Sequence, residues 1–271
     1  MKIIDAHIHF STNSPHFDQI AVAAGYENTT QGLQKNFADA GVCHGIVMGN
    51  RSLYPEDHKY PDFLHYCIGL DGSVLATVNP KEALALVEEN LKRDSCVGIK
   101  LYPGYSPYYL NDPMYAPFYQ LAEQFQKPVA VHMGATATSG ARLKYSHPLT
   151  MDDVAAAHPK VSFVMCHLGN PWIVDAVAVL DKNPNVAADL SGILEGKQDM
   201  ERFLKEKEGY LSHIRTWLQY AESYDRLLYG TDWPLANEID TVAFAKAIIP
   251  EKYWEQVFYK NARKIYSLGD C

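Results

Sequence analysis

The chain has 271 residues, of which 47% are hydrophobic and 21% are charged. This balance is typical of a globular protein with a sizeable core, and it excludes disordered, collagen-like and coiled-coil chains. The formal net charge is -8, with acidic and basic residues mixed along the chain. No basic stripe is available for a phosphate backbone, so we expect no nucleic-acid partner. Neither a signal peptide nor an apolar stretch of about 18 residues is recognisable, which predicts a cytoplasmic protein without a membrane partner.

The length fits one α/β barrel, which needs roughly 250 residues, so we expect a single domain over residues 1–271. Short apolar runs rich in Val, Ile and Ala alternate with amphipathic stretches, as strands and crossover helices do in a parallel sheet. Eight runs are predicted strands: 3–10, 42–48, 74–79, 97–102, 128–132, 162–167, 186–190 and 226–232. The sequence therefore predicts an α/β fold, a (β/α)8 TIM barrel.

Helices are predicted between these runs, at 30–40, 81–92, 115–125, 151–157 and 199–223, with a closing helix at 261–268 on the outside of the barrel. Two enlarged segments, 11–28 and 134–147, follow the first and fifth predicted strands. Active sites of such barrels lie at the carboxyl ends of the strands, so we expect these two segments to cover the substrate.

Five cysteines, Cys43, Cys67, Cys96, Cys166 and Cys271, form no CxxC pair, and three of them lie in apolar runs. We interpret them as buried free thiols rather than as a disulfide framework or a thiolate metal site. The chemistry is therefore expected from other side chains.

Histidine and aspartate residues end several of the predicted strands. His7 and His9 stand two residues apart in the first strand, so they share a face. His132, His167 and Asp232 end three other predicted strands. Because the carboxyl ends of barrel strands converge on one rim, these five side chains can meet. Imidazoles with one carboxylate suit Zn²⁺ or a similar first-row ion such as Mn²⁺.

The motifs around these residues occur in order along nearly the whole chain. They are DAHIHF at 5–10, GIKLYP at 98–103, VHMG at 131–134, CHLGNP at 166–171, YGTDWP at 229–234 and NARKIY at 261–266. In these motifs the chain resembles the amidohydrolase superfamily, specifically its decarboxylase and lactonase-like branch, the amidohydrolase 2 group. The resemblance implies a (β/α)8 barrel with metal ligands His7, His9, His132 and Asp232, and with His167 supporting the ligands or acting as catalytic base.

Lys100 ends the fourth predicted strand, and its alternation with neighbouring apolar residues predicts that it points into the barrel. Members of the superfamily with two metals use a carboxylated lysine at the corresponding strand. The branch that the chain resembles generally uses one metal. We therefore expect one divalent ion, Zn²⁺ with Mn²⁺ as the alternative, and a second ion with carboxylated Lys100 is the less favoured arrangement.

A divalent cation with an open coordination position lowers the pKa of bound water from about 15.7 to about 7 and polarises a carbonyl. Asp232 can accept the water proton and pass it to the leaving group, and His167 can orient or polarise the carbonyl oxygen. These roles predict a metal-dependent hydrolase that acts on a small carboxylated lactone, cyclic ester or amide through a metal-activated water.

Substrate contacts are expected from residues near the strand ends: Arg51, Lys100, Tyr102, Tyr105, Arg142, Trp172 and Trp233. Arginine pairs with a planar carboxylate in bidentate fashion. Arg51 and Arg142, together with Lys100, therefore indicate a small-molecule substrate that carries a carboxylate.

Two alternatives stay open. The resembled branch also includes non-oxidative decarboxylases of aromatic or unsaturated carboxylic acids, in which the metal binds substrate oxygens and a basic group such as Arg51 anchors a carboxylate. The second alternative is a non-catalytic barrel that binds a metal or a sugar acid. Barrels of this group often associate, so a homodimer or a higher oligomer is compatible with the sequence.

Overall fold

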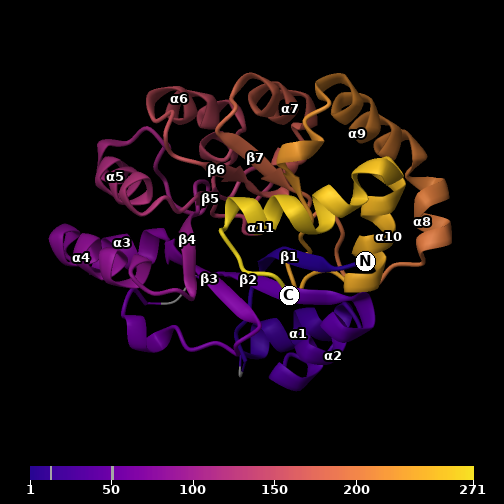
Figure 1. The fold of residues 1–271 in the computed structure, drawn as a ribbon, viewed down its shortest axis with the longest axis horizontal. Helices are drawn as coiled ribbons and strands as arrows, with labels where there is room; N and C mark the ends of the chain where they lie inside the picture. Colours follow the sequence, from indigo (N-terminus) through magenta and orange to yellow (C-terminus); the bar gives the residue numbers. More distant parts are fainter. Residues whose placement is uncertain (13, 50–51) are drawn as a thin grey trace.

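The computed structural model describes residues 1–12, 14–49 and 52–271. Eight parallel strands form one sheet in chain order, as predicted for an α/β barrel (Figure 1). They are β1 (Ile3–Ile8), β2 (Val42–Met48), β3 (Leu64–Leu70), β4 (Cys96–Leu101), β5 (Val129–Val131), β6 (Phe163–Met165), β7 (Val186–Asp189) and β8 (Leu227–Leu228).

The sheet closes between β1 and the segment that follows β8. The Ala6 N–H donates to the Tyr229 carbonyl at 3.0 Å, and the Asp232 N–H donates to the His7 carbonyl at 2.8 Å. A further bridge pairs Ile8 with Trp233. Closure therefore brings the first predicted ligands, at the end of β1, against the last one, in the segment after β8.

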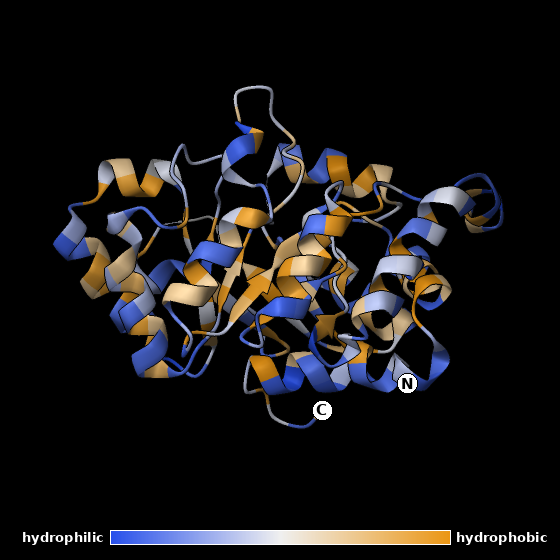
Figure 2. Cartoon of the chain, turned by 90° about the horizontal axis from the view of Figure 1, so that it is seen from above, coloured by the Kyte–Doolittle hydropathy of each residue, from blue (hydrophilic) through white to orange (hydrophobic). Residues whose placement is uncertain are grey.

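Helices surround the strands, and the apolar strand residues gather at the centre of the molecule (Figure 2). The helices are α1 (Pro15–Ala23), α2 (Thr30–Ala40), α3 (Gly72–Thr77), α4 (Pro80–Leu91), α5 (Ala116–Phe125), α6 (Leu149–Ala157), α7 (Ile173–Lys182), α8 (Met200–Glu206), α9 (Glu208–Ala221), α10 (Glu238–Ile248) and α11 (Asn261–Ile265). The single helix predicted over 199–223 is thus two helices. None of the helices in the described residues is long and apolar enough to cross a membrane.

The third predicted strand is wrong. Residues 74–79 begin in helix α3, and the strand at this place in the barrel is β3, ten residues earlier. The Asp71 carboxylate accepts from the Val74 N–H at 2.9 Å, which supports the first turn of α3. A short apolar run does not distinguish a strand from a buried helix turn, and here the local hydrogen bond favours the helix.

The predicted closing helix does not pack on the outside of the barrel. Tyr259, Ala262, Tyr266 and Leu268 instead join an apolar cluster made of one or two residues from each strand, among them Ile4 of β1. The C-terminal segment therefore closes one end of the barrel interior. The remaining core lies between the strands and the surrounding helices.

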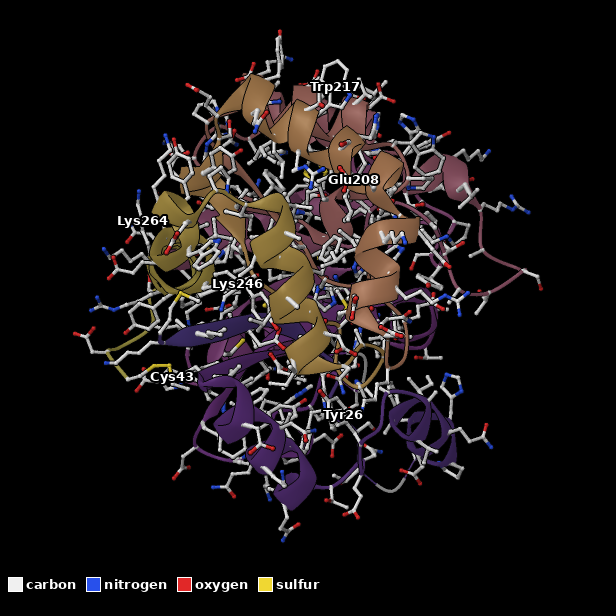
Figure 3. All side chains as sticks on the ribbon, turned by 90° about the vertical axis from the view of Figure 1, so that its right-hand side faces the viewer. Tyr26, Cys43, Glu208, Trp217, Lys246 and Lys264 are labelled. Carbon is white, nitrogen blue, oxygen red and sulfur yellow. A yellow bond between two sulfur atoms is a disulfide. The ribbon has the colours of Figure 1, made fainter. Side chains whose placement is uncertain are left out.

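The prediction that all five cysteines are free is wrong for two of them. Cys43 and Cys271 form a disulfide with their Cα atoms 6.0 Å apart (Figure 3). The pair is 228 residues apart in the sequence and meets because the chain end returns to the start of β2. Cys67, Cys96 and Cys166 are buried and free, as predicted.

Candidate metal centre

A cavity of about 740 Å³ adjoins the predicted ligands. It is lined by His7, His9, His16, Phe17, Asp71, Gly72, Ala76, Lys100, Tyr102, Tyr105, Pro107, Tyr108, His132, Ala137, Thr138, His167 and Asp232. All five predicted histidine and aspartate residues are in this lining. The two enlarged segments also contribute, 11–28 through α1 with His16 and Phe17, and 134–147 through Ala137 and Thr138.

The protonated nitrogen of His7 is fixed by Asp189, the last residue of β7. His7 Nδ1 lies 3.0 Å from Asp189 Oδ2, and both side chains are fully buried. A carboxylate accepts only, so Nδ1 carries the proton and Nε2 keeps its lone pair. Nε2 lies 3.4 Å from Asp232 Oδ1, and within the described chain neither atom has a hydrogen-bond partner.

His9 is oriented in the same way by a backbone carbonyl. Its Nδ1 lies 3.1 Å from the Met48 carbonyl oxygen, which can only accept, so Nδ1 is the donor. His9 Nε2 then faces Asp232 Oδ1 at 3.2 Å. The Asp232 oxygen is therefore in contact with the unprotonated nitrogens of His7, in β1, and of His9, which directly follows β1.

His132 and His167 bring two more unprotonated nitrogens together. His132 Nε2 donates to the Ala135 carbonyl at 3.0 Å, which leaves Nδ1 without a proton. His167 Nδ1 faces the carbonyl and hydroxyl oxygens of Ser191, and the Ser191 hydroxyl donates to Asp189, so Nδ1 is the donor and Nε2 is bare. The two bare nitrogens, His132 Nδ1 and His167 Nε2, are 3.1 Å apart.

These contacts join lone-pair atoms to one another, an arrangement that a shared cation stabilises. Two atoms bound to one first-row ion at about 2.1 Å lie roughly 3.0–3.4 Å apart, and the three contacts fall between 3.1 and 3.4 Å. Ligand atoms of His7, His167 and Asp232 also lie within 4.8 Å of one another. The donor set of neutral imidazoles and one carboxylate fits Zn²⁺ or a similar ion.

The protonation states follow the burial and the charges around the site. Burial lowers the pKa of His7 to about 4, and it also lowers the pKa values of His132 and His167. Burial raises the pKa of Asp232, but the polar contact with His9 and the nearby imidazoles of His7 and His167 together bring it below its usual range. The histidines are therefore held ready as neutral ligands around an ionised carboxylate.

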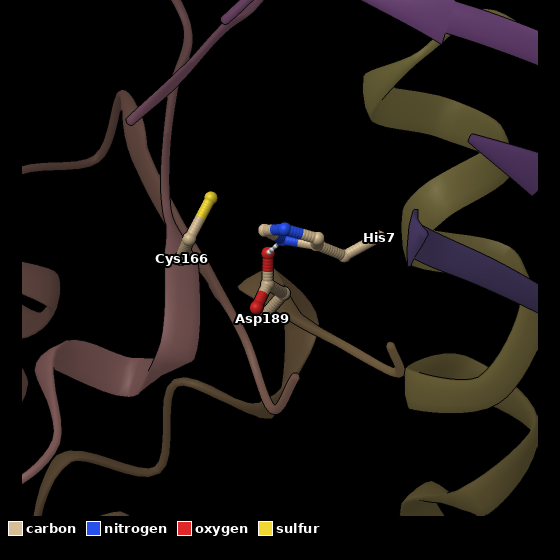
Figure 4. Close-up of side chains that lie close together, drawn as sticks. All are labelled: His7, Cys166 and Asp189. Atoms are coloured by element: carbon tan, nitrogen blue, oxygen red, sulfur yellow. Dashed lines mark hydrogen bonds and ion pairs between the residues drawn. The ribbon is translucent and has the colours of Figure 1, made fainter. Parts of the chain in front are cut away.

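A second group with metal-binding side chains consists of His7, Cys166 and Asp189, which lie close together (Figure 4). Its atoms are already engaged, because His7 Nδ1 and Asp189 are bonded to each other and Asp189 Oδ1 accepts from Ser191 and from the His167 N–H. Burial raises the pKa of the Cys166 thiol well above its ordinary value, so no thiolate is offered. This group serves to orient His7 rather than to bind an ion.

Lys100 is buried and reaches the cavity, as its position in β4 predicts. Its Nζ donates to the Cys166 Sγ at 2.8 Å and lies 5.4 Å from the centre of the Tyr102 ring. Its positive charge contributes to the lowered pKa values of His7 and His132. Lys100 thus places a positive charge at the inner end of the cavity.

The other predicted substrate contacts differ in position. Tyr102 lines the cavity, but its hydroxyl donates to the carbonyls of Met48 and Gly49. Tyr105 is 39% exposed at the rim, accepts from the Ala137 N–H at 2.8 Å, and has its ring centre 4.9 Å from that of His132. Tyr105 is therefore the tyrosine with its ring available to a bound molecule.

Three predicted contacts are outside the cavity lining, and one lies outside the described residues. Arg142 is exposed to solvent, Trp172 packs against His147, and Trp233 is fully buried against Phe10. Arg51 falls outside the described residues.

Several residues that shape the site are not among the predicted ones. Asp189 ends β7, so the strand-end rule that selects His132 applies to it equally. Gly192 has a φ of +61°, and a Cβ at this position would lie 2.7 Å from His167 Nδ1, which leaves no room for a side chain. Asp71, His16 and Phe17 reach the cavity from helices or turns whose path only the tertiary structure reveals.

Comparison with known proteins supports the fold. The search of curated proteins gave no match. Among solved structures, an uncharacterised TIM-barrel protein from Bordetella bronchiseptica is 21% identical, with a TM-score of 0.73, over 98% of this chain and 99% of that chain. A probable 2-pyrone-4,6-dicarboxylic acid hydrolase from Acinetobacter baumannii is 17% identical, with a TM-score of 0.66, over 99% and 100%. A 5-carboxyvanillate decarboxylase from Sphingomonas paucimobilis is 13% identical, with a TM-score of 0.64, over 99% of both chains.

Identities this low establish a common barrel and leave the reaction open. The family is established by the sequence itself, because the family described as Amidohydrolase matches residues 4–268. The match covers His7 and His9, the other strand-end residues of the centre and the C-terminal segment that closes the barrel. The chain therefore belongs to the amidohydrolase family.

Proposed function

We propose that this protein is a metal-dependent hydrolase that acts on a small carboxylated lactone, cyclic ester or amide. The observation that carries the proposal is the group of His7, His167 and Asp232 at the wall of a cavity, whose ligand atoms lie within 4.8 Å of one another. His9 contacts Asp232 of this group, and His132 contacts His167. A divalent ion bound there would lower the pKa of a coordinated water to about 7 and polarise a carbonyl.

The chain's own residues supply the proton transfer. Asp232 is ionised and borders the cavity, so it can accept a proton from the attacking water and return it to the leaving group. His167 is less suited to this role, because Ser191 binds its Nδ1 and its Nε2 faces His132. We therefore assign His167 to the ligand set and Asp232 to proton transfer.

The cavity favours a small flat anion. Its volume of about 740 Å³ is in the range of small-molecule sites. The rings of Phe17, Tyr105 and Tyr108 form much of its wall, and Lys100 supplies the buried positive charge. Lys100 and Asp232 line the same cavity, so one small substrate can present a carboxylate to Lys100 and a carbonyl to Asp232.

The decarboxylase alternative is supported by the same site. Lys100 can anchor a carboxylate, and the similar structures include decarboxylases of 5-carboxyvanillate and 2,6-dihydroxybenzoate. The two reactions differ in their products. Hydrolysis consumes water and opens a ring or releases an amine, whereas decarboxylation releases CO₂ and puts a proton on carbon.

The test is a parallel screen of the metal-reconstituted protein with carboxylated lactones and with carboxylated phenols. Acid release and CO₂ release are followed separately, with the Asp232→Asn protein as control. We expect acid release from a lactone, no CO₂, and a loss of at least about 100-fold in the Asp232→Asn protein, as for other general bases. CO₂ release from a phenol would favour the decarboxylase, and turnover by the chelated protein would contradict both reactions.

A further inference from the structure

Asn170 connects the two chain segments that carry His132 and His167. Its N–H donates to the His167 carbonyl at 2.9 Å, and its own carbonyl accepts from the Ala135 N–H at 2.8 Å. The Ala135 carbonyl in turn accepts from His132 Nε2 at 3.0 Å. Asn170 therefore links the segment after β6 to the segment after β5 through its backbone.

The two segments also touch directly at Gly134. This residue has a φ of +97°, and a Cβ at this position would lie 2.2 Å from the Asn170 carbonyl oxygen. The backbones are thus so close that no side chain fits between them. A displacement of Asn170 must therefore also displace the residues that follow His132.

Support from Asn170 matters because the turn that holds His167 is strained. His167 has a φ of +62° and Leu168 one of +45°, in the left-handed region that costs a residue with a Cβ about 1 kcal/mol or more. The His167 N–H donates to Asp189 Oδ1 at 2.9 Å at the start of this turn, and the Asn170 N–H closes its end. Contacts at both ends are needed to keep His167 Nε2 aimed at the metal centre.

The side chain of Asn170 is held from outside the barrel by Tyr210. The Tyr210 hydroxyl donates to Asn170 Oδ1 at 2.7 Å. Tyr210 lies in the first turn of helix α9, and neither residue is part of the cavity lining (Figure 1). Burial raises the pKa of Tyr210 to about 12, so its hydroxyl is a neutral donor at pH 7. The backbone contacts of Asn170 do not require a particular side chain, so its amide serves to bind Tyr210.

We propose that Asn170 and Tyr210 are positioning residues of the metal centre. Tyr210 fixes the side chain of Asn170, and the backbone of Asn170 then sets the separation of His132 Nδ1 and His167 Nε2, which is 3.1 Å. Both residues act through the two histidines and touch no substrate. An outer helix of the barrel thereby takes part in the geometry of the site.

The inference rests on the proposed function, so its test combines a metal-binding readout with one that needs no metal. Co²⁺ affinity and the visible absorption spectrum of bound Co²⁺ are measured for the wild type, for Tyr210→Phe, for Asn170→Ala and for the double variant. Each single variant removes the same hydrogen bond and keeps the backbone contacts of residue 170. We expect each to bind Co²⁺ about 3–10-fold more weakly, the value of one hydrogen bond, with a changed spectrum. The double variant should lose no more than the weaker single variant, because the two effects share one contact.

The matched control is Tyr119→Phe on helix α5. The Tyr119 hydroxyl donates to the Leu110 carbonyl at 2.8 Å, and Tyr119 lies outside the cavity lining. This variant also loses one hydrogen bond, but it is expected to keep the Co²⁺ spectrum and an affinity within about twofold of wild type.

The readout without metal is the exchange of the Ala135 N–H hydrogen with solvent, because this group donates to Asn170. In metal-free protein, we expect the exchange in Tyr210→Phe to be about 3–10-fold faster than in the wild type or in Tyr119→Phe.

Wild-type Co²⁺ affinity and spectrum in Tyr210→Phe would overturn the proposal, as would additive losses in the double variant or an equal loss in Tyr119→Phe. If Asn170→Ala does not fold, Tyr210→Phe and the exchange of Ala135 still decide. A wild-type protein that binds no Co²⁺, together with faster exchange of Ala135 in Tyr210→Phe, would contradict the proposed function and leave the link from Tyr210 to Ala135 standing.

Discussion

Asp189 determines which nitrogen of His7 carries a proton, so replacing it with asparagine is expected to weaken metal binding. In the wild type, Asp189 accepts from His7 Nδ1 at 3.0 Å, which leaves Nε2 bare. Its other oxygen accepts from the His167 N–H at 2.9 Å and from Ser191. In Asp189→Asn the single amide oxygen is retained by these donors, and the NH₂ group faces His7 Nδ1.

This NH₂ group and the Nδ1–H of His7 are both hydrogen-bond donors, so their contact is unfavourable. It becomes favourable when the proton of His7 moves from Nδ1 to Nε2. Nε2 is the atom 3.4 Å from Asp232 Oδ1, so the moved proton occupies the place of the metal. Loss of such a partner costs about 10–100-fold in metal affinity, or about 1.4–2.7 kcal/mol. We expect Asp189→Asn to fall in or above this range, because it changes the tautomer of His7 as well as its orientation.

The assay is a competition for Zn²⁺ between the protein and a coloured chelator, with ¹⁵N NMR of the imidazole nitrogens to identify the tautomer of His7. Asp152→Asn is the matched control, since Asp152 pairs with Lys182 on the surface, away from the cavity. Loss of other partners of metal ligands weakens metal binding about 10-fold or more. The reasoning would be refuted if Asp189→Asn bound Zn²⁺ within about twofold of wild type, or if the control lost the same affinity.

Three further predictions concern stability and charge. Cys271→Ser removes the disulfide that closes a loop of 228 residues, and it is expected to lower the free energy of unfolding by up to about 5 kcal/mol. This free energy is measured in urea with and without a reductant. Equal free energies of unfolding for reduced and oxidised wild type would contradict the prediction. Lys100→Met is expected to raise KM for a carboxylated substrate by about 10-fold or more without weakening Zn²⁺ binding; an unchanged KM would remove Lys100 from substrate binding. Glu238 of α10 is fully buried, and burial together with the charge of Asp5 raises its pKa well above the ordinary value. Relative to wild type, the unfolding free energy of Glu238→Gln should therefore rise by up to about 1.4 kcal/mol per pH unit above pH 5, because unfolded Glu238 loses its proton near its ordinary pKa while the folded residue keeps it. A difference that does not change with pH would contradict a neutral Glu238.

The barrel and its ligands could be predicted because both follow from one rule of parallel sheets. Residues such as His132, placed just after a strand, meet residues from other strands at the same rim. The third strand could not be assigned with the same security. The apolar run at 74–79 and the true strand Leu64–Leu70 are similarly short, so length does not distinguish them. What favours helix α3 is the local hydrogen bond that the Val74 N–H donates to Asp71.

Other features depend on contacts between distant segments. The Cys43–Cys271 disulfide forms because the chain end returns to the start of β2, and cysteine spacing carries no information about that return. Arg142 and Trp172 lie in the segments after β5 and β6, but the direction of their side chains is set by loop conformation. Asp5 joins the backbone of His7 to Thr231, although Asp5 and Thr231 are 226 residues apart.

The expected cytoplasmic location, the choice between Zn²⁺ and Mn²⁺, the number of ions, and a homodimer or higher oligomer stay predictions. The number of ions depends on Lys100. Its Nζ donates to Cys166, and carboxylation would have to break this contact. Metal analysis of the purified protein therefore also tests the preference for one ion.

The central claim is that five side chains bind one divalent ion at the rim of the barrel. The most direct test is a crystal structure of the Zn²⁺-loaded protein with anomalous diffraction at the zinc edge. A single anomalous peak is expected among His7 Nε2, His9 Nε2, Asp232 Oδ1, His132 Nδ1 and His167 Nε2. An empty site after reconstitution, or a zinc ion held elsewhere, would contradict it.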